Sequence, residues 1–184
     1  MRAVEQSIRL ARISQERFIQ APIDTVYSYV TQPDRWHEWH PTSLSADTGT
    51  TGSLPTGTRF TEVIDLLGVR VPMSYRVQIA RPPEEFKAVF TSLAVDGSIH
   101  YSLQACRDGT LFKRVLTYET ELQLAGLHER MAQLSTIALD QLKQRLENPA
   151  TVECPGIPRG RRRSIDCSPA HDRRQGQPSR NRIP

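Results

Sequence analysis

Five consecutive segments between residues 58 and 122 alternate apolar and polar residues, as β-strands with one buried face do. The segments are 58–67, 69–80, 85–93, 98–106 and 110–122. In the second segment every other residue from Val69 to Ile79 is apolar. Asp96-Gly97 and Asp108-Gly109 stand between segments and predict hairpin turns. We therefore expect an antiparallel sheet built of consecutive hairpins.

Residues 127–147 predict one long amphipathic helix after these strands. Apolar residues recur at helical spacing from Leu127 to Leu146, and charged residues lie mostly off this stripe. A sheet with one apolar face needs a cover, which this helix can supply. Upstream, residues 12–20 predict a strand, residues 23–30 a helix, and residues 33–40 a second short helix or turn. The order predicts an α+β fold.

The positive charge of the chain is concentrated at its C-terminal end. Residues 1–147 carry 16 Lys and Arg against 17 Asp and Glu, whereas residues 148–184 carry 8 Arg against 3 acids. A nucleic-acid-binding function is therefore not expected for the domain. We expect an extension over 1–11, a domain over 12–147, and a basic, disordered tail over 148–184. The tail has an arginine run at Arg159–Arg163 that leaves contact with nucleic acid or anionic lipid open.

Several classes of protein lack support in the sequence. No run approaches the ~20 apolar residues of a membrane-spanning helix, and the first residues lack the apolar core of a signal peptide. With three cysteines and no CxxC spacing, a cytoplasmic protein is expected. No nucleophile elbow, phosphate loop or dinucleotide fingerprint is present, so we expect no cofactor. His37-Glu38-Trp39-His40 lacks the HExxH spacing, and no metal site is expected.

A set of landmarks in order along residues 12–147 points to a known family. They are Ala21-Pro22 with Val26, Trp36, Trp39-His40-Pro41, Gly57, Val77, Pro82-Pro83, Gly109-Thr110 and the 127–147 helix. In these the chain resembles the START/Bet v 1-like (SRPBCC) superfamily, most closely its bacterial polyketide cyclase/dehydrase and lipid-transport group. The resemblance implies a helix-grip fold, in which a curved antiparallel sheet wraps around a long C-terminal helix and encloses a cavity.

The same resemblance implies a ligand but no particular reaction. Members bind apolar or amphipathic molecules such as lipids and polyketides, and some cyclise or dehydrate polyketide chains. The superfamily has no shared catalytic residue set. The first hypothesis is therefore binding or transport of a small hydrophobic ligand, and the alternative is a polyketide cyclase/dehydratase-type enzyme. A third hypothesis is a regulatory module that meets a partner or membrane through its basic tail. The oligomeric state is left open.

Alternation along the strands predicts which side chains face the helix. The expected ligand-binding residues are Trp39, Phe60, Glu62, Met73, Tyr75, Phe90, Tyr101, Phe112, Arg114, Tyr118, Met131 and Ser135. Filling of an ordinary core is the alternative for each aliphatic residue. The tyrosines are stronger candidates, because a buried phenol needs a hydrogen-bond partner and can hold the polar end of a ligand.

Arg114 and Glu62 are the charged residues on these predicted inner faces. If both point inward, an internal Arg–Glu pair would suit a ligand with a carboxylate, enol or ketone. If the last strand slips by one residue, Arg114 faces solvent instead. His37 and His40 lie in a segment expected near the cavity mouth. Together with Arg114 they are the weak catalytic candidates, as proton carriers and carbonyl-polarising group respectively.

Overall fold

The protein is represented by a computed structural model that describes residues 9–120 and 125–148. Its elements in chain order are β1 (Arg9–Ile19), α1 (Ile23–Val30), η1 (Pro33–Glu38, a 3₁₀ helix), β2 (Ser43–Asp47), β3 (Arg59–Leu66), β4 (Val69–Arg81), β5 (Glu85–Thr91), β6 (Asp96–Cys106), β7 (Gly109–Thr120) and α2 (Leu127–Glu147). This confirms the expected α+β order. The tail predicted for 148–184 lies outside the described residues except for Asn148, so its disorder and contacts stay predictions.

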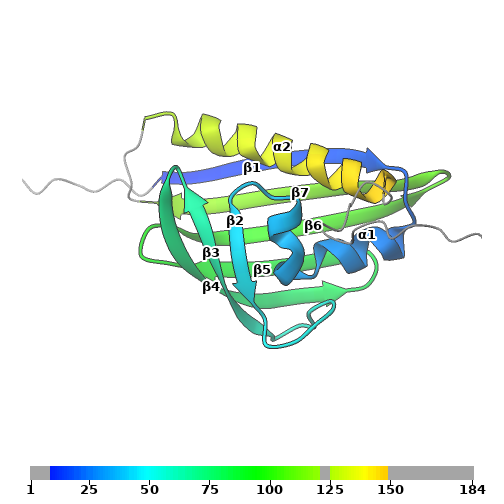
Figure 1. Cartoon of the computed structure of the whole chain (residues 1–184), viewed down its shortest axis with the longest axis horizontal. Helices are drawn as coiled ribbons and strands as arrows, with labels where there is room; N and C mark the ends of the chain where they lie inside the picture. The colour runs from blue at the N-terminus through cyan, green and yellow to red at the C-terminus, as the bar shows by residue number, and fades with distance from the viewer. Residues whose placement is uncertain (1–8, 121–124, 149–184) are drawn as a thin grey trace, which may run out of the picture. The chain divides into compact units, whose positions relative to one another are not determined.

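The seven strands form one antiparallel sheet in the order β1-β7-β6-β5-β4-β3-β2. Hairpins join β3 through β7, and β1 returns to pair with β7 from Arg9–Thr120 to Ile19–Thr110. Figure 1 shows the curved sheet with α2 lying along β1. None of the described helices is long and apolar enough to span a membrane.

Two turns differ from those predicted. Asp96 and Gly97 lie inside β6, and the β5–β6 turn is formed by residues 92–95. Gly97 is needed because β7 passes so close: a Cβ on Gly97 would lie 2.2 Å from the Thr117 carbonyl oxygen. In the β6–β7 hairpin the turn residues are Arg107-Asp108, and Gly109 begins β7. Both glycines serve close strand packing, a use that the hairpin signal does not distinguish from a turn.

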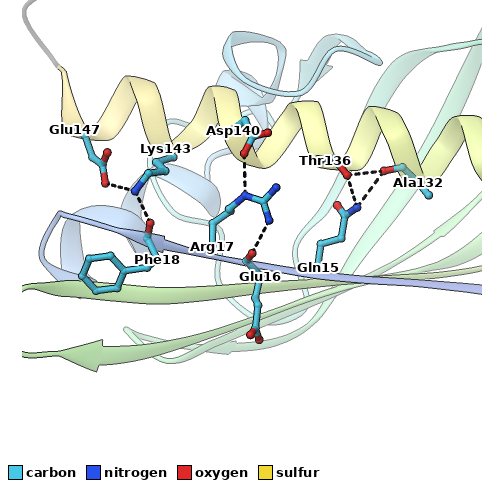
Figure 2. Close-up of polar contacts among 9 residues, drawn as sticks. All are labelled: Gln15, Glu16, Arg17, Phe18, Ala132, Thr136, Asp140, Lys143 and Glu147. Carbon is cyan, nitrogen blue, oxygen red and sulfur yellow. Dashed lines mark hydrogen bonds and ion pairs between the residues drawn. The ribbon is translucent and has the colours of Figure 1, made fainter.

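Polar contacts attach α2 to β1 along most of its length (Figure 2). Gln15 Nε2 donates to Thr136 Oγ1 at 2.6 Å and to the Ala132 carbonyl at 3.1 Å. Arg17 Nε donates to Asp140 Oδ1 at 2.8 Å, and Lys143 Nζ donates to the Phe18 carbonyl at 2.8 Å. The helix is thus fixed at one edge of the sheet, and its apolar stripe faces the inner side of the strands. Ser135, Ala138, Leu139 and Leu142 are buried there.

The short helices lie toward the end of the sheet that is opposite the β3–β4 and β5–β6 turns. α1 follows the end of β1, and the Thr110 hydroxyl at the start of β7 donates to the Ala21 carbonyl at 2.8 Å. Trp36 in η1 is buried, and its Nε1 donates to the Val30 carbonyl at the end of α1 at 2.8 Å. This bond holds the indole between the short helices and the sheet.

Candidate ligand-binding cavity

A cavity lies against the inner face of the sheet and the first half of α2. Its empty volume is about 710 Å³, counting the solvent at its opening. The lining residues are Trp36, His40, Thr42, Glu62, Ile64, Leu66, Met73, Tyr75, Phe90, Val95, Ile99, Tyr101, Arg114, Leu116, Tyr118, Thr120, Leu127 and Met131. Most are apolar or aromatic, so the cavity suits a ligand that is largely hydrophobic.

Arg114 enters this cavity from β7 and is buried, with 6% of its surface exposed. The inward register is therefore the one that forms, and the slipped alternative is wrong. Its Nη1 donates to Ser135 Oγ on α2 at 3.1 Å. Its Nε is buried and has no hydrogen-bond partner among the described residues. A buried cation held by a neutral hydroxyl leaves donor capacity unused, which is costly without a further acceptor.

Glu62 is the buried carboxyl of the same cavity, and it makes no ion pair with Arg114 among the described contacts. The direct Arg–Glu pair considered from the sequence is therefore wrong. Burial raises the pKa of Glu62 to about 7, against the opposing effects of the Ser43 and Tyr75 hydroxyls and the Arg114 charge. A carboxyl with this pKa exchanges its proton near neutral pH.

His40 lines the cavity, whereas His37 is exposed. Burial and, secondarily, the Arg114 charge hold the pKa of His40 well below its ordinary value, so the ring is neutral. Its Nδ1 accepts the Thr42 backbone N–H at 3.4 Å and lies 2.8 Å from Thr42 Oγ1. The ring proton therefore sits on Nε2, which is buried without a partner among the described residues. His40 is a second unused donor.

Two buried phenols stand close to these charges. Burial raises the pKa of Tyr101 to about 12, and the adjacent Arg114 guanidinium partly opposes that rise. Burial and the Glu62 charge raise the pKa of Tyr75 well above its ordinary value. Both rings therefore stay neutral at physiological pH. Arg114, His40, Glu62, Tyr75 and Tyr101 together form what we call the polar pole of an otherwise apolar cavity.

Aromatic rings pack against the two tyrosines of the polar pole. Trp36 meets Tyr75 edge-on at 5.7 Å between ring centroids and Tyr101 at 6.5 Å. Phe60 stacks on Tyr75 at 4.7 Å with an interplanar angle of 9°. Phe112 meets Tyr101 edge-on at 5.3 Å. These contacts fix the orientation of both phenols, since each ring is restrained on more than one side.

The structure divides the predicted ligand-binding residues into two groups. Glu62, Met73, Tyr75, Phe90, Tyr101, Arg114, Tyr118 and Met131 line the cavity. Trp39, Phe60, Phe112 and Ser135 are buried but do not line it. Phe60 and Phe112 lie behind the phenols that they support, and Ser135 holds Arg114. Phe60, Phe112 and Ser135 are buried, as their predicted inward direction requires, and their contact with a ligand stays a prediction.

Trp36 rather than Trp39 faces the cavity, and the reason is the end of η1. The 3₁₀ helix ends at Glu38, and its C-cap residue Trp39 has φ −134° and ψ −18°. Residues after that point no longer follow the helical period, and Trp39 is buried without lining the cavity. Trp36 is buried, and His40 is half-buried with its Nε2 enclosed. The position of this segment near the cavity mouth stays a prediction.

Other lining residues were not among the predicted ligand-binding residues. Ile64, Ile99 and Leu116 share faces with predicted residues and follow from the same alternation. Leu66, Val95, Thr120 and Leu127 lie where strands or the helix begin or end. Alternation gives no signal at such ends, because turn geometry decides where those side chains point. Within residues 9–120 and 125–148, no three His, Cys, Asp or Glu side chains form a group able to hold a metal ion.

The family model for polyketide cyclase / dehydrase and lipid transport matches residues 11–147. The chain belongs to this family. No curated protein matches the sequence significantly. Solved structures share the helix-grip fold of the polyketide cyclase/dehydrase and lipid transport family at low identity.

Three of these structures illustrate the likeness. An uncharacterised protein from Rhizobium leguminosarum has 18% identity and a TM-score of 0.61, covering 77% of this chain and 97% of its own. A START superfamily protein from Mycobacterium smegmatis has 15% identity and a TM-score of 0.58, covering 75% and 95%. Ara h 8.0201 has 13% identity and a TM-score of 0.56, covering 75% and 98%. Identities this low establish the fold alone.

Proposed function

We propose that the protein binds a small, largely apolar ligand whose polar end is an anion or a strong acceptor such as a carboxylate, enolate or ketone. The observation that carries this proposal is the buried Arg114 guanidinium, which has an unused donor and no carboxylate partner. A cation in an apolar cavity is stabilised by a counter-group, and a ligand can supply it. The Nε2–H of His40 offers a second donor to the same end of the ligand.

Binding of two matched probes tests the proposal. A dansyl-labelled fatty acid carries a carboxylate, and its methyl ester keeps the apolar chain without the charge. We expect the acid to bind more tightly than the ester, and Arg114→Met to remove that difference. Arg76→Met is the matched control, because Arg76 is exposed on β4. Equal affinity of both probes for the wild-type protein would refute the assignment of the polar pole. Native mass spectrometry of freshly purified protein would identify the natural ligand.

A second candidate function is cyclisation or dehydration of a polyketide-like chain, and Glu62 is the observation that favours it. A carboxyl with a pKa of about 7 can take and return a proton near neutral pH. Arg114 would polarise the carbonyl, and the cavity would hold the chain folded for intramolecular attack. In this candidate reaction Glu62, and not His37, carries the proton, because His37 is exposed.

The enzymatic candidate is tested by turnover of a linear poly-β-ketone thioester. We expect Glu62→Gln to abolish turnover while binding of the dansyl-labelled fatty acid persists. The wild-type rate should show an inflection near pH 7 that the variant lacks. Absence of turnover by the wild-type protein across this pH range would leave ligand binding as the function.

A further inference from the structure

Two buried groups of opposite charge line the same cavity without forming an ion pair. Glu62 lies on β3 with 4% of its surface exposed, and Arg114 lies on β7 with 6% exposed. None of the ion pairs among the described residues joins them. The charge of Arg114 nevertheless acts on Glu62. A ligand seated on Arg114 therefore lies within the electrostatic reach of Glu62.

The strands around Glu62 bring hydroxyl groups toward it and a single cation. The Ser43 hydroxyl on β2 and the Tyr75 hydroxyl on β4 face the Glu62 carboxyl and favour its ionised form. Tyr101 on β6 faces the same pole, and burial raises the pKa of its phenol to about 12, so that it stays neutral. From β7 the facing group is Arg114.

The segments that cover the sheet add no further charge to the lining of the cavity. His40, which follows η1, lines the cavity as a neutral ring, because burial holds its pKa well below the ordinary value. α2 contributes Leu127 and Met131 to the lining, and its Ser135 hydroxyl accepts a hydrogen bond from the guanidinium. Among the described lining residues, the carboxyl on β3 and the guanidinium on β7 are therefore the two groups that carry charge near neutral pH.

An anionic ligand changes this balance of charge. In the empty cavity, an ionised Glu62 and the Arg114 cation cancel. A ligand carboxylate on Arg114 leaves one net negative charge, with two like charges shielded from water. A proton on Glu62 removes that excess, as it does for buried carboxyls that share a site. Such a proton is exchanged near neutral pH, because burial raises the pKa of Glu62 to about 7.

We propose that an anionic ligand and a proton bind to this cavity together, with the proton on Glu62 and the anionic end of the ligand on Arg114. The inference rests on the proposed function of the cavity. Glu62 takes the proton from solvent, and no covalent bond of the ligand changes. By linkage, the ligand tightens proton binding at Glu62 by the same factor by which the proton tightens ligand binding. The protein therefore holds an anion more tightly at slightly acidic pH and releases it as the pH rises, whereas a neutral ketone escapes this coupling.

Titration with the dansyl-labelled fatty acid at pH 6.5 and at pH 8.5 tests this inference. An aliphatic carboxyl has an ordinary pKa of about 4.3, so the probe is ionised at both values. We expect its affinity for the wild-type protein to be about tenfold lower at pH 8.5, while the methyl ester binds equally at both. Glu62→Gln should bind the acid equally at both pH values, because it has no titrating carboxyl. Glu84→Gln, at an exposed position, is the matched control and should follow wild type.

Calorimetry of the wild-type protein counts the proton directly and does not depend on the folding of any variant. Titration with the acid in two buffers of different protonation enthalpy should show uptake of about half a proton or more at pH 8, and titration with the ester should show none. His40→Gln should take up the proton as wild type does. Uptake that is lost in His40→Gln and kept in Glu62→Gln would place the proton on His40 and overturn the assignment.

The outcomes separate this inference from the function of the cavity. If the acid binds more tightly than the ester, but with the same affinity at both pH values and without proton uptake, the inference fails and the proposed function stands. Proton uptake that persists in Glu62→Gln would assign the proton to the ligand or to another group, and would also overturn the inference. If the acid binds no more tightly than the ester at either pH, the anion site itself is refuted.

Discussion

A 3.1 Å hydrogen bond from Arg114 Nη1 to Ser135 Oγ connects the inner face of β7 to the buried face of α2. Both residues are buried, and the guanidinium retains an unused Nε donor among the described residues. Neighbours that are neutral at physiological pH, Tyr101 and His40, adjoin it rather than a carboxylate partner. The cation therefore destabilises the empty protein relative to an apolar residue of similar size.

Replacement of Arg114 by methionine should lower the affinity for the ligand without lowering the stability of the fold. We expect Arg114→Met to unfold at equal or higher urea concentration, with a free energy of unfolding unchanged or raised by ~1 kcal/mol or more. Affinity for the dansyl-labelled fatty acid should fall at the same time. Urea unfolding monitored by circular dichroism gives the first quantity. A marked loss of stability would mean that a group of the protein itself, and not a ligand, supplies the counter-charge of Arg114.

The raised pKa of Glu62 predicts a definite dependence of stability on pH. The folded protein binds this proton more tightly than the unfolded chain, whose carboxyl has an ordinary value of 4.5. The resulting stabilisation is present below about pH 4.5 and is lost as the pH rises to about 7, by up to ~3 kcal/mol. Glu62→Gln should therefore exceed wild type in stability at pH 8 and match it at pH 5. Glu84→Gln, at an exposed position, should follow wild type throughout.

Gly97 should not tolerate even one added methyl group. A Cβ there would lie 2.2 Å from the Thr117 carbonyl oxygen and 2.9 Å from Tyr118 Cα, and both are backbone atoms that cannot rotate away. We expect Gly97→Ala to lower the free energy of unfolding by ~1–3 kcal/mol or more through displacement of β6 from β7. Ser98→Ala, at the next position, should change it little. Near-wild-type stability of Gly97→Ala would show that the two strands can separate at this point.

Two positions on α2 that lie two residues apart should differ sharply in how much stability they contribute. Leu139 is fully buried against the sheet, whereas Ile137 is 42% exposed. Leu139→Ala should cost ~2–5 kcal/mol of unfolding free energy, since it leaves a cavity in the core. Ile137→Ala should cost less than ~1 kcal/mol. Chemical denaturation of both variants measures the difference, and similar losses would mean that α2 packs with a different face.

The alternation of side chains was sufficient to predict most of the inner face. Tyr75, Tyr101 and Tyr118 point inward because the alternation holds where each lies; in β4 the register shifts only later, between Val77 and Ile79. The same alternation could not place Arg114, since a slip of one residue reverses both faces of a strand. Pairing of β7 with β1 on one side and β6 on the other fixes the register, with Arg114 opposite Gln15 and Tyr101. Such long-range pairings are not encoded in any local pattern.

Short helices and turns account for the failed predictions. Trp36 lies inside η1 and Trp39 directly follows its end. No capping residue in the sequence marks that end, so the sequence did not distinguish the two tryptophans. Asp96-Gly97 has the composition of a turn, but close passage of β7 requires its glycine within a strand.

The pairing of β1 with β7 has a consequence for how the protein is made. β1 is synthesised first, but its neighbour in the sheet emerges only after β2 through β6 have been translated. The helix that covers the inner face follows later still. A ribosome adds ~5–20 residues per second, so the inner face of the sheet stays exposed for several seconds before α2 has been synthesised. Growing chains of this protein therefore expose an incomplete sheet until the last helix is released.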